Sequence, residues 1–228
     1  MMSNILILDT STKRSVLAVR TKTDFLEETT DRTNDHSRDI LDRINKLVFA
    51  SGIRLSDLDT IIFGSGPGSY TGIRITVGVV QGLGFGLNIP VVPVSSLAAM
   101  AQEMISARVK TMKEGSKIFV GLKARQQEIW FGSYEWRNEM LSTLFPEEAI
   151  DVKNLYALPD GEWFGIGTAF EFHEQIELLT GVKFVSFFPD EFISAKALLE
   201  IGKPKFEAGE TIESYKAIPN YLKDVVIG

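Results

Sequence analysis

The chain has 228 residues, a formal net charge of −6, no cysteine and 44% hydrophobic residues. The lack of cysteine excludes disulfides, cysteine zinc sites and thiol nucleophiles, and the acidic balance argues against this chain alone holding a polyanion. No stretch reaches the ~18 apolar residues of a membrane span, and the start MMSNILILDT lacks the pattern of a signal peptide. We therefore expect a cytoplasmic protein that folds throughout.

Short apolar runs and polar turns predict that strands and helices alternate in the first half of the chain. Strands are expected at 4–8, 15–20, 25–30, 60–63 and 89–94. The helix expected at 38–51 has candidate N-caps at Asn34, Asp35 and Ser37 and an end at Gly52. Its apolar stripe consists of Ile40, Leu41, Ile44, Leu47 and Val48. Further helices are expected at 71–86 and from Ser95 or Ser96 to about residue 107.

The sequence changes character around residues 111–115, where a Lys-Glu-Gly turn occurs. We expect a boundary here between an N-terminal lobe at 1–110 and a smaller C-terminal lobe at 111–228. Strands are expected at 117–122, 128–135, 140–145 and 163–166, helices at 169–179 and 195–201, and an extended tail at 212–227. Two successive units, each with strands first and helices after, predict an α/β protein with a mixed sheet.

The stretch GSGPGSYTGIRITVGVVQGLGFG, from Gly64 to Gly86, joins a glycine-rich loop to a predicted helix. That helix carries Gly78, Gly82 and Gly86 at every fourth position. Glycines in the loop suit an unusual turn or a close approach to the main chain. Within a helix each glycine costs roughly 1 kcal/mol relative to alanine. Three on one face therefore predict that another backbone packs there.

The glycine loop fails three sequence templates for chemistry. A phosphate-binding loop needs a lysine where Ile73 stands, and the dinucleotide pattern needs a third glycine where Ser69 stands. The Gly-x-Ser-x-Gly nucleophile elbow is not matched. We favour a structural or interface role, while the helix N-terminus after the loop keeps anion binding open.

The segment Asp9-Thr10-Ser11-Thr12 follows the first predicted strand and is similar to the phosphate loop of actin-like ATPases. Ser11 occupies the expected glycine position, where a side chain would crowd a phosphate. Asp9 and Ser11 are candidates for residues near a nucleotide. The alternative is an aspartate that caps a β-turn.

The remaining polar and aromatic residues do not predict a catalytic or metal site. His36 precedes a helix, and His173 lacks a second ligand at metal spacing. Arg125-Gln126-Gln127-Glu128 favours a hairpin turn rather than a catalytic glutamate. The aromatic residues at strand spacing are interpreted as core and sheet-face residues rather than a base-stacking platform: Trp130, Phe131, Tyr134 and Trp136.

Three motifs together identify a resemblance. The Asp9-Thr10-Ser11-Thr12 turn, His36-Ser37 at a helix start and Gly66-Pro67-Gly68-Ser69-Tyr70-Thr71-Gly72-Ile73-Arg74 follow one another in the chain. In this order and spacing the chain closely resembles the TsaB family, also called YeaZ, over its first 110 residues. The second half matches only through Lys123-Ala124-Arg125, Glu128-Ile129-Trp130 and Pro219-Asn220-Tyr221-Leu222.

The resemblance implies a two-lobed actin-like (ASKHA, ribonuclease H-like) fold with mixed central sheets. It also implies a role in the threonylcarbamoylation of adenosine 37 in tRNAs that read codons beginning with A. In that family the protein is an inactive paralogue of TsaD, the subunit that transfers the threonylcarbamoyl group. It pairs with TsaD, is joined by the ATPase TsaE, and forms homodimers when alone. Contact with tRNA is then indirect, and no cofactor is expected apart from ADP or ATP at the complex interface.

Two departures from related sequences bear on chemistry. TsaD relatives carry a metal-binding His-x-x-x-His whose positions fall at or near Ser96 and Met100 here. A hydroxyl and a thioether do not replace two imidazoles as ligands for iron or zinc. Lys123 stands where relatives often have an aspartate before the Ala-Arg pair. We therefore expect neither a catalytic residue nor a metal site.

We expect the helices at 38–51 and 71–86 to contact TsaD as a four-helix arrangement, because the glycines permit close approach. The residues expected to bind the partner are His36, Ile40, Ile44, Leu47, Tyr70, Ile73, Arg74, Val77, Gly78, Gly82 and Gly86. The main alternative is an active actin-like ATPase or sugar kinase, which calorimetry with Mg-ATP would distinguish. A peptidase has little behind it, because no metal pair or nucleophile set is present.

Overall fold

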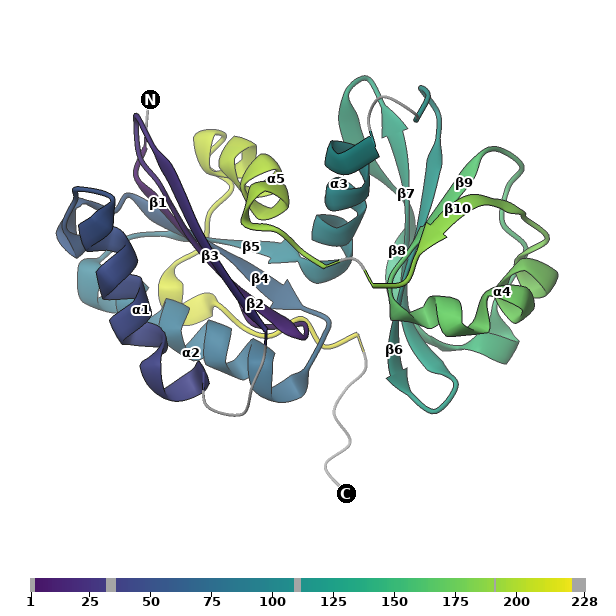
Figure 1. Ribbon diagram of the computed structural model, residues 1–228, viewed down its shortest axis with the longest axis horizontal. Coiled ribbons are helices and arrows are strands. Elements are labelled where there is room, and N and C mark those ends of the chain that lie inside the picture. The colour runs from purple at the N-terminus through teal and green to yellow at the C-terminus, as the bar shows by residue number, and fades with distance from the viewer. Residues whose placement is uncertain (1–2, 32–35, 109–111, 191, 223–228) are drawn as a thin grey trace. The chain divides into compact units, whose positions relative to one another are not determined.

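The computed structural model describes residues 3–31, 36–108, 112–190 and 192–222. The chain divides into two compact units (Figure 1). The first unit consists of Met1–Ala99 and Ile193–Asn220, and the second spans Met100–Phe192 and resumes at Tyr221. Each unit contains one five-stranded mixed sheet.

The sheet of the first unit has the strand order β3-β2-β1-β4-β5. Its strands are β1 (Ile5–Asp9), β2 (Arg14–Arg20), β3 (Phe25–Asp31), β4 (Thr60–Gly66) and β5 (Val91–Ser95). The first three strands pair antiparallel, as the predicted hairpins require, and β1–β4 and β4–β5 pair parallel. Every residue of β1 and β4 is buried, which is the pattern of central strands covered on both faces.

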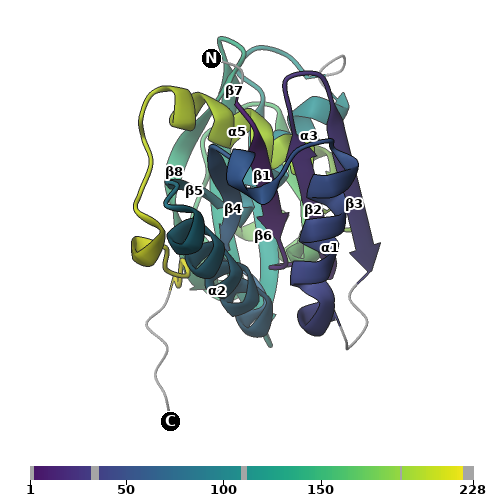
Figure 2. The ribbon, with the colours of Figure 1, turned by 90° about the vertical axis from the view of Figure 1, so that its left-hand side faces the viewer.

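Helices cover both faces of this sheet. On one face lie α1 (His36–Ala50) and α2 (Tyr70–Leu87), and on the other lies α5 (Ala195–Glu207) (Figure 2). Along each strand, successive side chains point to opposite faces of the sheet. Leu6, Leu8 and Phe63 belong to the core under α1 and α2, whereas Ile62 contacts α5, where a Cβ on Gly202 would lie 2.5 Å from its Cγ2.

Local signals explain where the helices begin and end. The α1 helix stops at Ala50, and Gly52 follows with φ +72° as predicted. The hydroxyl of Ser69 accepts a hydrogen bond from Gly72 N at the start of α2, and Asn88 ends that helix in the left-handed conformation. In α3 (Ser96–Arg108) the cap is Ser95, whose Oγ accepts from Leu97 N at 3.1 Å. The caps expected for α1 at Asn34 and Asp35, and the side chain of Ser37, lie outside the described residues.

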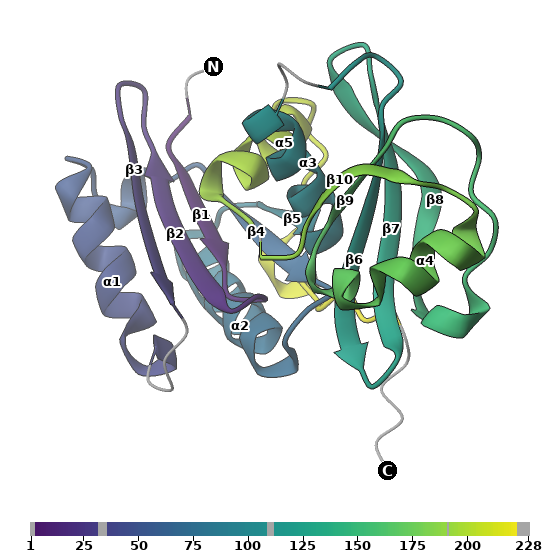
Figure 3. The ribbon, with the colours of Figure 1, turned by 45° about the vertical axis from the view of Figure 1, so that its right-hand side comes forward.

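The second unit repeats the strand order of the first, as β10-β9-β6-β7-β8 (Figure 3). The strands are β6 (Lys117–Arg125), β7 (Glu128–Arg137), β8 (Met140–Asp151), β9 (Trp163–Ile166) and β10 (Phe184–Phe188). Again three antiparallel strands are followed by two parallel ones. The core contains Phe119, Phe131, Trp163 and Phe170, and α4 (His173–Thr180) packs on it through Ile176. Two such mixed sheets confirm the predicted actin-like α/β fold.

The structure corrects the expected division at residue 110. Residues 193–220 belong to the first unit rather than to a C-terminal lobe at 111–228. The reason is packing, because α5 contacts β1, β2, β4 and β5, and the expected tail at 212–227 bonds to β5 through Val91 and Ile212. Within the described residues, no helix combines the length and apolar character needed to cross a membrane.

Candidate partner-binding surface

The glycines of the loop after β4 are explained by close packing against the turn after β1. A Cβ on Gly64 would lie 1.5 Å from Oδ2 of Asp9, and one on Gly68 would lie 2.5 Å from the carbonyl oxygen of Ser11. The backbone N–H of Ser69 donates to that same carbonyl at 2.7 Å. Side chains would not fit, so the loop glycines have a structural reason that needs no ligand.

The turn after β1 is a buried polar cluster. Oδ1 of Asp9 accepts hydrogen bonds from the backbone N–H of Ser11 at 2.8 Å and from its hydroxyl at 2.9 Å. The Ser11 hydroxyl also lies 3.0 Å from that of Ser96, and Asp9, Ser11 and Ser96 are all buried. The aspartate thus caps its own turn with serine donors. A position of Asp9 and Ser11 near a nucleotide stays a prediction.

The glycine stripe on α2 lies open. Gly78, Gly82 and Gly86 are exposed, and apart from the helix's own backbone and the adjacent residues, no atom of the described residues lies within 4 Å of the position that a Cβ would take on any of them. Phe85, between two of these glycines, is 77% exposed. The stripe is therefore an apolar helix face on which nothing packs among the residues that the structure describes. Each of its glycines weakens the helix by roughly 1 kcal/mol relative to alanine.

The neighbouring helix α1 adds exposed apolar side chains. Leu41 is 51% exposed and Phe49 is 84% exposed. Both helices cover the same face of the sheet (Figure 2). We define the α1/α2 surface by its exposed apolar and glycine members, namely Leu41, Phe49, Gly78, Gly82, Phe85 and Gly86.

Several residues expected to bind a partner are core residues instead. Ile40, Ile44, Ile73 and Val77 are buried in the cluster between the sheet and the two helices, and Leu47 is partly buried against it. This is a correction with a simple cause, because the periodic apolar stripe of a surface helix faces its own core.

The remaining predicted residues have different outcomes. The backbone of His36 begins α1, but its side chain lies outside the described residues. Tyr70 and Arg74 are exposed at the start of α2, with the guanidinium carbon of Arg74 3.8 Å from the centroid of the Tyr70 ring. Sequence reasoning placed Leu41 in the apolar stripe and passed over Phe49 and Phe85. Both could have been recognised in the sequence, because they are large apolar residues that lie outside the periodic apolar stripe of their helices.

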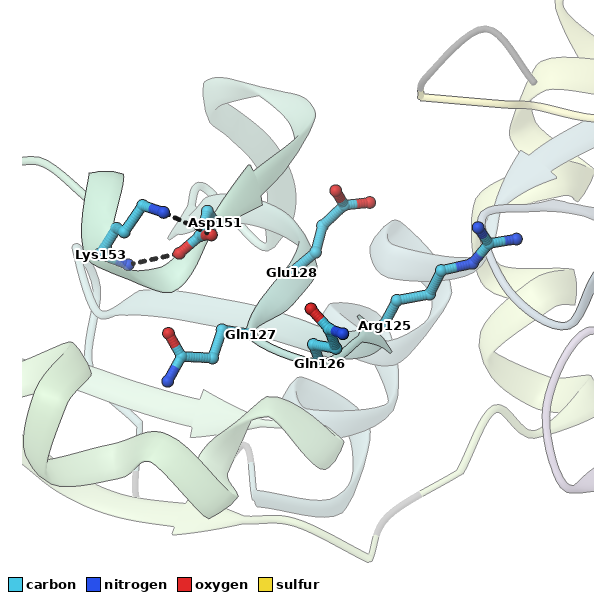
Figure 4. Close-up of a pocket in the computed structure, with 6 residues that line it drawn as sticks. All are labelled: Arg125, Gln126, Gln127, Glu128, Asp151 and Lys153. Atoms are coloured by element: carbon cyan, nitrogen blue, oxygen red, sulfur yellow. Dashed lines mark hydrogen bonds and ion pairs between the residues drawn. The ribbon is translucent and has the colours of Figure 1, made fainter. Parts of the chain in front are cut away.

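A hollow lies in the second unit, at the hairpin between β6 and β7 (Figure 4). It has a volume of about 810 Å³ and is lined by Arg125, Gln126, Gln127, Glu128, Asp151 and Lys153. Gln126 and Gln127 form the turn, with φ +44° at Gln126, so the predicted hairpin is confirmed. Figure 4 shows the side chains pointing apart, and both interactions drawn join Lys153 to Asp151, namely the ion pair and the hydrogen bond from Lys153 N to Asp151 Oδ1. They do not converge on a point where a reacting atom could sit.

Comparison with known proteins decides the family. The chain matches residues 28–200 to a family model described as "TsaD: tRNA N6-adenosine threonylcarbamoyltransferase". The tRNA threonylcarbamoyladenosine biosynthesis protein TsaB of Haemophilus influenzae is 30% identical, with 97% of this chain and 94% of that protein covered. The chain belongs to the TsaB family. Its relative of the same name in Escherichia coli K12 is 28% identical, with 84% of this chain and 82% of that protein covered.

A solved structure supports the TsaB-family match over both units. YeaZ from Pseudomonas aeruginosa is 30% identical and superposes with a TM-score of 0.86, covering 97% of this chain and 100% of that one. The three motifs that carried the resemblance lie in the first 110 residues, so this coverage adds evidence for the second unit.

Three positions of this chain, at which related sequences carry other residues, have local structural roles. Ser96 and Met100, at or near the positions that the resemblance assigns to metal ligands, are both buried on α3. Across the described residues there is no cluster of three or more His, Cys, Asp or Glu side chains able to hold a metal ion. Lys123 pairs with Glu171, and its backbone N–H donates to Thr168 Oγ1 at 2.9 Å. Its ammonium thus forms a local ion pair at the position where related sequences often have an aspartate.

Proposed function

We propose that this chain is a non-catalytic subunit of the complex that threonylcarbamoylates adenosine 37 in tRNAs reading codons beginning with A. In this proposal it binds TsaD through the α1/α2 surface, and TsaE joins the pair. The observation that carries the proposal is the open glycine stripe of α2 with the exposed Phe85 in it, together with the exposed Phe49 on α1. Membership of the TsaB family supplies the pathway and the class of partner.

The chemistry of the α1/α2 surface suits a helical partner. Glycines lower the height of a helix surface, so a second helix can approach more closely than the usual 8–10 Å between axes. Arg74 is the only charged residue in the α2 sequence YTGIRITVGVVQGLGFGL. Desolvating this face therefore costs little, while Phe49 and Phe85 supply the aromatic area that often dominates binding energy.

The rest of the proposal concerns what the chain leaves to its partners. Asp9 is engaged with Ser11, and Ser96 and Met100 are poor metal ligands, so we assign the group transfer to TsaD. With a net charge of −6, this chain contacts tRNA only through the complex. An ADP or ATP molecule belongs, if anywhere, at the complex interface. We place this activity in the cytoplasm and propose that the chain forms homodimers when alone.

Substitution of the central glycine of the stripe tests the proposal. Gly82→Leu fills the open face with a side chain, so we expect its association with TsaD to weaken by at least about tenfold. Analytical ultracentrifugation of the two proteins measures this. The matched control is Ala107→Leu, which adds a similar volume to an exposed position of α3. Undiminished association of Gly82→Leu, with both variants folded by circular dichroism, would show that the α1/α2 surface is not the contact.

A further inference from the structure

Residues 212–220, which we call the strap, run along the first unit after α5 and are fixed to it at several points. Ile212 exchanges two backbone hydrogen bonds of 2.9 Å with Val91 of β5. The side-chain Nε2 of Gln81 donates to the carbonyl of Ala217 at 2.7 Å, and the backbone N–H of Asn220 donates to Ser65 O at 2.7 Å. Ala217 is fully buried. The backbone of the strap is thus held at both ends and in the middle.

Although its backbone is fixed, the strap exposes large apolar side chains. Tyr215 is 62% exposed and Ile218 is 70% exposed, on either side of the buried Ala217. Scattered exposed apolar residues are ordinary on protein surfaces. These two are different in that they stand close together on a fixed segment and contribute nothing to the core of their own unit.

The strap adjoins the open stripe of α2. Its short 3-10 helix, Ser214–Lys216, packs on α2, and a Cβ on Gly84 would lie 2.6 Å from Cβ of Ser214. Gln81 and Gly84, which contact the strap, flank Gly82 and precede Phe85 in sequence. Figures 1 and 2 show the yellow strap beside α2. The strap, with its exposed Tyr215 and Ile218, therefore lies beside the helix that carries the glycine stripe.

Local charges hold the Tyr215 ring in place. Its hydroxyl donates to Glu213, and Lys216 Nζ lies 2.8 Å from that carboxylate and 5.6 Å from the ring centroid. Hydrogen bonds from Lys216 and then from Tyr215 lower the pKa of Glu213, and the Glu213 carboxylate raises the pKa of Tyr215. The pair of charges is satisfied within the strap, which leaves the aromatic ring as the feature offered to a partner.

We infer that the strap is the second part of the TsaD-binding surface, with Tyr215 and Ile218 as contact residues for an apolar helical face of TsaD. This rests on the proposed function, because the occupant follows from the packing of the strap on α2, the helix that carries the glycine stripe of the α1/α2 surface. A fixed backbone means that little conformational entropy is lost when these side chains bind. Tyrosine is also among the residues that most often dominate interface energetics.

The test is a pair of truncations measured by isothermal titration calorimetry with TsaD. We expect Tyr215→Ala and Ile218→Ala each to weaken binding several-fold, and the double variant to weaken it by roughly tenfold or more. Far-UV circular dichroism and the unfolding temperature should stay unchanged, because both side chains are exposed. Val185→Ala and Leu178→Ala, which truncate exposed apolar residues of the second unit, serve as matched controls and should bind as the unmodified chain does.

The outcomes separate this inference from the proposal on which it rests. If Gly82→Leu weakens binding and the strap variants do not, the strap is no part of the surface and the proposed function stands. If neither weakens binding, both fail. Strap variants that lose only self-association of this chain, while binding TsaD normally, would assign the strap to a homodimer and overturn the inference.

Discussion

Gly82 and Gly84 lie two residues apart on α2 but in different surroundings. A Cβ would meet nothing within 4 Å at Gly82, whereas at Gly84 it would lie 2.6 Å from Ser214 and 3.1 Å from Val91. We expect Gly82→Ala to raise the free energy of unfolding by about 1 kcal/mol, because alanine is the better helix former. Gly84→Ala should lower it, because the strap must shift. Urea or thermal unfolding checks both, with a gain of roughly 2–4 °C expected for Gly82→Ala.

Equal destabilisation by the two alanine substitutions would contradict an open stripe. If the predicted difference is found, Gly78, Gly82 and Gly86 weaken the isolated chain without any packing gain inside it. Whatever these glycines contribute must then arise in an assembly with another protein. This argument concerns stability alone and does not depend on the identity of the partner.

At the scale of the element, one face of α1 packs in the core and stabilises the fold, and the other face is exposed and is proposed to bind the partner. Ile44 is 1% exposed and packs in the core, whereas Phe49 is 84% exposed. We expect Ile44→Ala to lower the free energy of unfolding by about 2–5 kcal/mol through the cavity it leaves. Phe49→Ala should change stability by less than about 0.5 kcal/mol yet weaken TsaD binding. Chemical denaturation and calorimetry measure the two effects, and a large loss of stability in Phe49→Ala would contradict the exposed placement.

The sequence predicted most helices and strands, because buried positions carry apolar residues at the spacing of the element. The continuous apolar run of β1 and the period of α1 were sufficient to place both. Two elements were predicted too short at a proline. Pro146 lies near the register shift where β8 opposes β7, and Pro204 lies inside α5. Both elements continue beyond their proline because pairing with β7 and packing on the first sheet outweigh the local preference against it. Strand β10 was missed because the sequence of Phe184–Phe188 does not alternate between apolar and polar residues, although one face of the strand is partly covered and the other is exposed.

The candidate site was predicted in part for the same physical reason. The glycine stripe was recognised because glycines inside a helix require an explanation. The side chains around it were chosen from the apolar stripe, which identifies the core and not the free face. The strap gave no periodic signal, since hydrogen bonds to Gln81, Val91 and Ser65 place it. Such long-range contacts cannot be read from a local pattern.

At the scale of the whole molecule, the proposed function predicts dependence of tRNA modification on this chain. Reconstitution with TsaD, TsaE and the other components should yield threonylcarbamoyladenosine when the chain is present and little or none when it is left out. Gly82→Leu should behave like omission, and Ala107→Leu like the unmodified chain. Mass spectrometry of digested tRNA provides the measurement. Full threonylcarbamoylation of the tRNA in the absence of this chain would contradict the proposal.

The return of residues 193–220 to the first unit has a consequence for how the protein is made. The face of the first sheet that α5 covers, including Ile62, has its partner encoded more than a hundred residues later. During synthesis that apolar face emerges from the ribosome long before Gly202 can pack on it. A chain truncated at residue 110 would keep it bare, so the first unit cannot be expressed as a simple N-terminal fragment. Its completion waits until residues 193–220 have been translated.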